Sequence, residues 1–151
     1  MRELPSGEGP EQLWSLVREQ AGRAPAFGVI GLEGASLHLA TARDARRVRE
    51  AMPAGLSPAS RELDVLVLNE TILHPLLGID AAALTGGVVD FTEEVETAWE
   101  QVRDGDYVAF LVNPVRVDQI VAVADADDVL PQKSTFFYPK LATGMVLNPL
   151  D

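Results

Sequence analysis

"GGVVDFTEEVETAWEQVRDGDYVAFLVNPVRVDQIVAVA", residues 86–124, is the stretch that decides the fold. It opens with an apolar run at 86–91 and contains a second one at 106–113. A helical stripe lies between them, with members at i, i+3, i+4 and i+7: Val95, Ala98, Trp99 and Val102. Because a right-handed crossover joins parallel strands, the pattern predicts a β-α-β-α unit over 86–124 in which the two apolar runs are parallel strands.

The last helix of this unit is predicted to begin at "NPVR". Asn113 suits the cap of a helix and Pro114 its first turn. The expected core-facing stripe is Val117, Ile120, Val121 and Ala124. Arg116 lies in the first turn, where a cation opposes the helix dipole, and a bound anion would relieve that conflict. Alternatively, Arg116 points into solvent or pairs with Asp118 or another acid.

Two apolar runs on either side of Gly34 predict an N-terminal β-hairpin over 26–42, and a last strand is expected at 143–150. The complete pattern is that of an α/β or α+β fold with a mixed sheet of about five strands. We expect a single domain over 10–151, after a flexible lead-in of residues 1–9.

The composition narrows the class of protein. The 151 residues are enough for one domain with its own core, and 47% of them are hydrophobic. The formal net charge of −11 argues against nucleic acid as a partner, because phosphates need a basic face. There is no cysteine, no apolar run of the ~20 residues that span a membrane, and no apolar signal core near the start. A cytoplasmic location is therefore expected, without a membrane partner.

The two lysines of the chain, Lys133 and Lys140, lie in the stretch "PQKSTFFYPK". Lys133, Ser134 and Thr135 offer an ammonium and two hydroxyl groups, which suit a phosphate or a carboxylate. Tyr138 and Lys140 add a phenol and a second ammonium. The segment lacks the glycine-rich run of a P-loop. Alternatively, its aromatic residues anchor it to the core and its polar side chains simply face water.

Residues 62–73 are apolar nearly all round and predict a buried helix. We expect it to end near His74, because Pro75 disfavours helical geometry in the residue before it. Glu70 and His74 are four residues apart and can pair on one face of that helix. His74 is thus a candidate acid or base, or a capping or ion-pairing histidine. No catalytic residue is assigned.

No metal site is predicted. Two histidines without cysteine give no zinc site. Asp125, Asp127 and Asp128 could hold magnesium beside a phosphate, but their spacing lacks the glycine and the distal glutamate of a calcium loop. The sequence favours a solvated acidic turn there.

Three stretches, residues 64–80, 88–126 and 130–150, resemble in order and spacing the C-terminal portion of a bacterial family known as domain of unknown function 1015. "PQKSTFFYPK" and "LVNP" are the most diagnostic parts. Full members of the family also have an N-terminal portion with a histidine motif that looks catalytic. The resemblance therefore implies an isolated C-terminal part or a truncated relative. The chain departs from the family at Asn69, where relatives usually have histidine, and at Asp127, where they often have glycine.

The family is linked to ParB-like and sulfiredoxin-like proteins, some of which are ATP-dependent kinases of free serine. The resemblance implies a domain that binds a small anion, a phosphate, nucleotide or carboxylate, as part of a kinase-like enzyme whose other portion is missing. ATP and magnesium are possible cofactors by family analogy alone. We expect little or no catalysis by the lone chain. The alternative is a non-catalytic interaction or regulatory module that pairs with a separate N-terminal-type protein or with itself.

Overall fold

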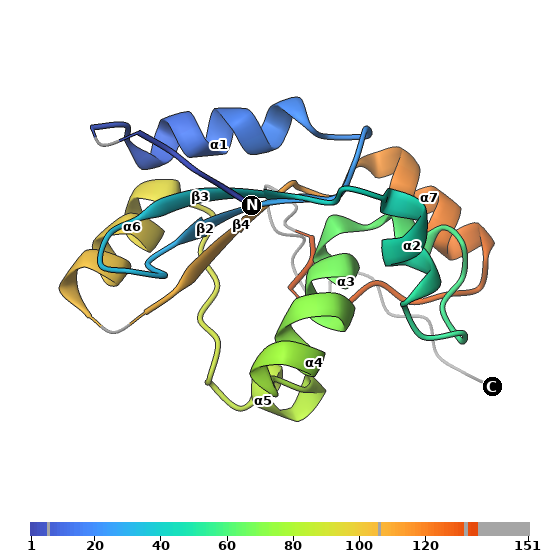
Figure 1. Ribbon diagram of the computed structural model, residues 1–151. Helices are drawn as coiled ribbons and strands as arrows, with labels where there is room; N and C mark the ends of the chain where they lie inside the picture. The colour runs from blue at the N-terminus through green and yellow to red at the C-terminus, as the bar shows by residue number, and fades with distance from the viewer. Residues whose placement is uncertain (6, 106, 132, 136–151) are drawn as a thin grey trace, which may run out of the picture.

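The computed structural model describes residues 1–5, 7–105, 107–131 and 133–135 (Figure 1). Its elements are β1 (Arg2–Glu3), α1 (Pro10–Glu19), β2 (Ala26–Ile30), β3 (Leu37–Thr41), α2 (Ala45–Glu50), η1 (Ser60–Glu62), α3 (Asp64–Leu68), η2 (Asn69–Leu73), α4 (His74–Leu77), α5 (Ala81–Thr85), α6 (Val95–Asp104), β4 (Ala109–Val112) and α7 (Val117–Asp125). Of these, η1 is a 3₁₀ turn and η2 a π-helical turn. Among the described residues, no helix is long and apolar enough to cross a membrane.

The strands form one antiparallel sheet in the order β1-β3-β2-β4, so the expected mixture of helices and sheet is confirmed. In β2, Val29 pairs with His38 of β3 on one side and with Phe110 of β4 on the other. The hairpin predicted over 26–42 is confirmed, with Gly34 at φ 58° in its turn. β1 lies in the segment expected to be a lead-in and pairs with β3.

The parallel pair of strands and the count of about five strands were wrong predictions. Residues 86–91 form a turn and coil, and the described part of the chain contains four strands. Gly86 caps the end of α5 and Gly87 has φ 84°, so the glycine pair turns the chain out of an extended path. The following Val88 and Phe91 are exposed. The predicted β-α-β-α unit is therefore α6-β4-α7, and β4 joins the hairpin antiparallel to β2. The strand expected at 143–150 lies outside the described residues.

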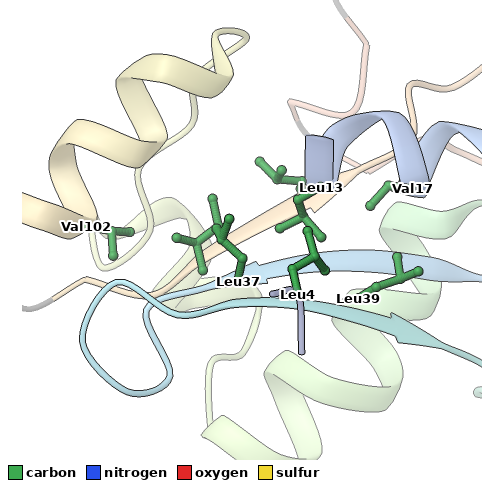
Figure 2. Packing of buried hydrophobic residues seen from close by; sticks show 8 residues of the cluster. Leu4, Leu13, Val17, Leu37, Leu39 and Val102 are labelled. Atoms are coloured by element: carbon green, nitrogen blue, oxygen red, sulfur yellow. The ribbon is translucent and has the colours of Figure 1, made fainter. Parts of the chain in front are cut away.

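α1 and α6 pack on one face of the sheet, as Figure 2 shows. The buried cluster on this face consists of Leu4, Leu13, Val17, Ile30, Leu37, Leu39, Val102 and Leu111. The predicted stripe of α6 is confirmed, because Val102 belongs to the cluster and Val95 and Trp99 pack against it. Gly28 of β2 permits the close approach of α1, since a Cβ there would lie 3.0 Å from the Leu13 side chain.

A second cluster joins β2 to the region of α3 and α7. Its buried members are Phe27, Met52, Leu63, Leu66, Val67, Leu68, Leu73 and Val123. The core-facing stripe predicted for α7 lies on the wrong side of the helix. Val117 is 71% exposed and Val121 is 53% exposed, whereas Val123 is 1% exposed. The helix is apolar on more than one side, so periodicity alone did not select the side that meets the core.

The helix predicted over 62–73 is confirmed, but the end predicted near His74 is wrong. α3 continues through η2 into α4, and the helix ends at Gly78, which has φ 68°. In a regular α-helix the ring of Pro75 would clash with the carbonyl four residues earlier. The wider π-helical turn of η2 directly precedes the proline and removes that regular spacing. The chain can therefore stay helical past Pro75.

Candidate functional site

A cleft of about 400 Å³ lies where the end of α1, the start of α3 and the segment between β4 and α7 meet, with α2 in its wall. Charged side chains from all of these elements line it. Four are arginines and three are acids: Arg18, Arg23, Arg49, Arg116, Glu62, Asp64 and Asp118. Four of the ten arginines of an acidic chain thus gather in one place. We call this place the arginine cleft.

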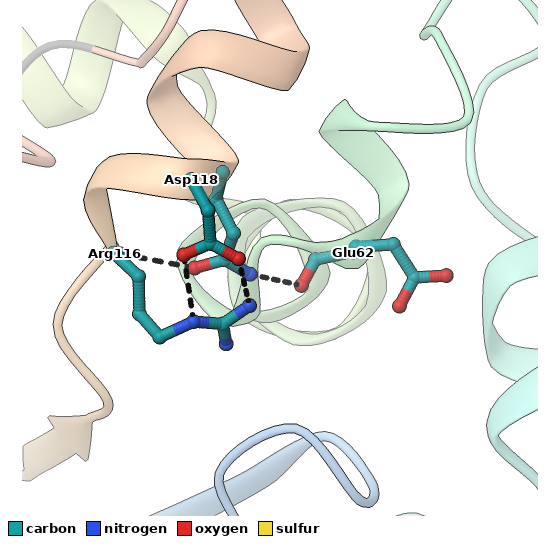
Figure 3. Close-up of polar contacts among 4 residues, drawn as sticks. Glu62, Arg116 and Asp118 are labelled. Carbon is teal, nitrogen blue, oxygen red and sulfur yellow. Dashed lines mark hydrogen bonds and ion pairs between the residues drawn. The ribbon is translucent and has the colours of Figure 1, made fainter.

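Arg116 forms a bidentate ion pair with Asp118, as Figure 3 shows. Its Nε donates to Asp118 Oδ1 at 2.9 Å and its Nη2 donates to Oδ2 at 2.8 Å. This contact lowers the pKa of Asp118 and raises that of Arg116. Of the two interpretations of Arg116 left open by the sequence, the structure shows the pairing with Asp118. Both side chains are largely exposed, so the pair contributes little to stability.

The start of α7 differs from the prediction. Arg116, not Asn113, is the N-cap, and its backbone N–H donates to Gln119 Oε1 at 3.0 Å. Gln119 Nε2 in turn donates to the backbone oxygen of Glu62 at 3.3 Å, which connects α7 to η1 (Figure 3). Pro114 stays outside the helix, because α7 begins at Val117.

Asn113 instead connects three elements at the floor of the cleft. Its Nδ2 donates to Asp64 Oδ2 at 3.0 Å and to the backbone oxygen of Val17 at 3.3 Å. The side chain therefore joins the end of β4 to the start of α3 and to α1. Both amide hydrogens are used, while Asn113 Oδ1 is buried without a hydrogen-bond partner among the described residues.

Asp64 is a half-buried carboxylate in this wall, and sequence reasoning did not single it out. Burial raises its pKa more than the hydrogen bond from Asn113 and the charge of Arg49 lower it. The signal in the sequence was weak: an acid that directly precedes the apolar run "VLVL". Perturbed acids in clefts are candidates for functional groups.

Arg49 reaches the cleft from α2 and pairs with Glu62, with Nη2 to Oε2 at 2.6 Å. Its Nε is buried and has no hydrogen-bond partner in the described part of the chain. Arg18 and Arg23 also line the cleft, and neither forms a salt bridge with any residue that the structure describes. The site therefore holds guanidinium groups that lack a carboxylate partner.

The lysine segment does not line this cleft in the described residues. Lys133 is exposed and has φ 60°, and Ser134 Oγ donates to the backbone oxygen of Pro131 at 2.7 Å. Thr135 is half-buried. Tyr138 and Lys140 lie outside the described residues. The structure thus brings Asn113 and Arg116 together and leaves Lys133, Ser134 and Thr135 apart from them.

Glu70 and His74 lie on η2 and at the start of α4. No hydrogen bond or ion pair joins their side chains in the part of the chain that is described, and His74 is exposed. A π-helical turn displaces the regular i, i+4 spacing on which the expected pairing rests.

Asp128 has a structural role within the acidic turn. Its Oδ2 accepts from Ser60 Oγ at 2.6 Å and from the Ser57 backbone N–H at 2.9 Å. These bonds hold the pKa of Asp128 well below its usual range. They connect the end of α7 to the loop before η1. Among the described residues, no group of three or more acids or histidines is arranged to hold a metal ion.

Comparison with known proteins gives no match: no family model, no curated protein and no solved structure matches this chain. The arginine cleft and its contacts are therefore the basis for a functional proposal.

Proposed function

We propose that the chain binds a small oxyanion, such as a phosphate or carboxylate group, in the arginine cleft. The observation that carries this proposal is the charge distribution. A chain of net charge −11 places four arginines against three acids in one concave site. Four arginines minus three acids give the cleft lining a net charge of +1, so the cleft favours an anion more than the rest of this acidic chain does.

Two kinds of arginine support the site. Arg18 and Arg23 lack an ion-pair partner among the described residues, so their guanidinium groups are open to a ligand. Arg49 and Arg116 are held by Glu62 and Asp118 in partly or largely exposed ion pairs. Such pairs are typically worth less than about 1 kcal/mol, so an anion can compete for these arginines at small cost.

The volume of about 400 Å³ is in the range of small-molecule sites. It suits the phosphate, nucleotide or carboxylate ligands that the family resemblance implies. A kinase-like reaction with ATP and magnesium stays a prediction of that resemblance.

Isothermal titration calorimetry with sulfate, phosphate and ATP tests the proposal. We expect one-site binding, and we expect Arg18→Gln and Arg23→Gln each to weaken it about tenfold, the loss of one charged hydrogen bond. Arg103→Gln on α6 is the matched control, because this arginine is exposed outside the cleft. Absence of binding by all three anions, or an equal effect of the control, would rule the site out.

A second candidate function is an interaction module, favoured by apolar side chains on the surface. Leu76, Leu77, Val88 and Phe91 are exposed along one continuous segment of the chain. Light scattering after size exclusion, over a range of concentrations, tests self-association. A mass that rises with concentration and falls back in Leu76→Glu would support this function, and a monomer throughout would count against pairing with itself.

A further inference from the structure

Asp64 differs from the other two acids of the arginine cleft. Glu62 and Asp118 each face an arginine in an ion pair, at 2.6 and 2.8 Å. Asp64 forms no salt bridge with any described residue, and its hydrogen bond comes from the neutral amide of Asn113. It is also the only half-buried acid of the three, since Glu62 and Asp118 are exposed.

Asp64 lines the cleft, so an anion bound there would lie near this carboxylate. Two negative charges in a partly buried site repel each other more strongly than in water, because the local dielectric constant is lower. The repulsion disappears if Asp64 is neutral. Its Oδ2 is engaged by Asn113, whereas its Oδ1 accepts no hydrogen bond from the described residues. Oδ1 can therefore carry a proton and donate it in a hydrogen bond to an oxygen of the ligand.

We propose that Asp64 takes up one proton from solvent when the cleft takes up its anion, and returns it when the anion leaves. The cleft would thus bind anion and proton together, and acid conditions would strengthen binding. This inference rests on the proposed function. Anion binding in the cleft would then depend on pH. Ionised Asp64 would repel the ligand, whereas protonated Asp64 would donate a hydrogen bond to it.

Six other charged side chains line the cleft and could also contribute to a pH dependence of binding. They are Arg18 of α1, Arg23 after α1, Arg49 of α2, Glu62 of η1, Arg116 before α7 and Asp118 of α7. Arginines stay charged at any relevant pH. The two other acids are exposed and each forms an ion pair with an arginine, whereas Asp64 is half-buried and has no such partner among the described residues. Burial raises the pKa of Asp64, and a bound anion would raise it further.

Sulfate is the probe of choice, because it stays doubly charged across the tested range and any proton taken up must go to the protein. Calorimetric titrations in buffers of different ionisation enthalpy count the protons taken up on binding. We expect uptake of up to one proton, and an affinity that rises by up to tenfold for each unit by which the pH falls, from about pH 8 to about pH 5.

Asp64→Asn is the decisive variant, because an amide oxygen can still accept from Asn113 and the fold is expected to persist. It should abolish proton uptake, flatten the pH dependence and bind sulfate at least about tenfold tighter near pH 8. Glu62→Gln is the matched control and should keep the uptake. Sulfate binding without proton uptake would overturn this inference and leave the proposed function standing. Absence of sulfate binding at every pH would overturn both.

Discussion

At the scale of single residues, Asn113 shows how one side chain organises the site. It connects Val17 at the end of α1 with Asp64 at the start of α3, from its own place after β4. The sequence predicts Asn113 to be a helix cap, because Asn-Pro is a common start of a helix. The structure uses its amide instead to hold a carboxylate in the cleft wall.

Asp64→Asn should stabilise the protein at neutral pH. Its folded-state pKa is raised by burial, so the unfolded chain loses this proton at a lower pH than the folded one. The contribution of Asp64 to stability is therefore full below the unfolded pKa of about 3.9 and decreases as pH rises through the folded pKa. Urea unfolding should give a higher midpoint for the variant at pH 7 and equal midpoints near pH 3. A lower midpoint at pH 7 would contradict the assignment.

Ser60→Ala should destabilise the protein by on the order of 1 kcal/mol, because the buried hydroxyl of Ser60 donates a hydrogen bond to Asp128 that alanine cannot make. Asp128 contributes stability with the opposite sign of pH dependence from Asp64. Its lowered pKa gives a contribution that is present above about pH 4 and is lost as pH falls further. The destabilisation by Ser60→Ala should therefore shrink in acid, which urea unfolding at two pH values measures. A pH-independent loss would mean that the hydroxyl acts through packing alone.

At the scale of elements, the approach of α6 and β4 to the hairpin depends on Gly31. A Cβ there would lie 2.6 Å from Val102 Cγ1 and 2.7 Å from the backbone oxygen of Tyr107, at φ 93°. Gly31→Ala should cost more than about 2 kcal/mol, from strain and overpacking together. Gly34→Ala is the control, because its Cβ would meet open space at φ 58° and should cost about 1–2 kcal/mol. Equal losses in thermal unfolding would refute the close contact.

α7 offers a second matched pair of variants. Val123 is buried in the second cluster, whereas Val121 on the same helix is exposed. Val123→Ala should lower the free energy of unfolding by about 1–3 kcal/mol, through lost burial and a small cavity. Val121→Ala should change it by less than about 0.5 kcal/mol. Chemical unfolding of both variants distinguishes the observed face of the helix from the stripe that periodicity predicted.

At the scale of the whole molecule, the sequence predicted the elements better than their arrangement. The hairpin and the α6 stripe follow from local rules, a glycine turn and a 3.6-residue period, and both are present. Residues 86–91 form no strand, and β4 instead pairs antiparallel with β2, which lies far earlier in the chain. The local pattern of residues 106–113 does not say which distant strand β4 pairs with.

The site was predictable only in part, for the same reason. Arg116 and Asn113 stood out by their place before a helix, and they do share a cleft. Arg18, Arg49 and Asp64 come from distant parts of the chain and have no shared spacing, so only the fold brings them together. The lysine segment was conspicuous in composition, yet its described residues lie outside this cleft.

The most direct test of the central claim is an NMR titration with inorganic phosphate that follows arginine Nε–H signals and the side-chain amide of Asn113. Phosphate bound in the arginine cleft should shift the signals of Arg18, Arg23 and Asn113, saturate with a single affinity, and leave Arg103 unchanged. Shifts confined to the backbone around Lys133, or equal shifts at Arg103, would contradict the account.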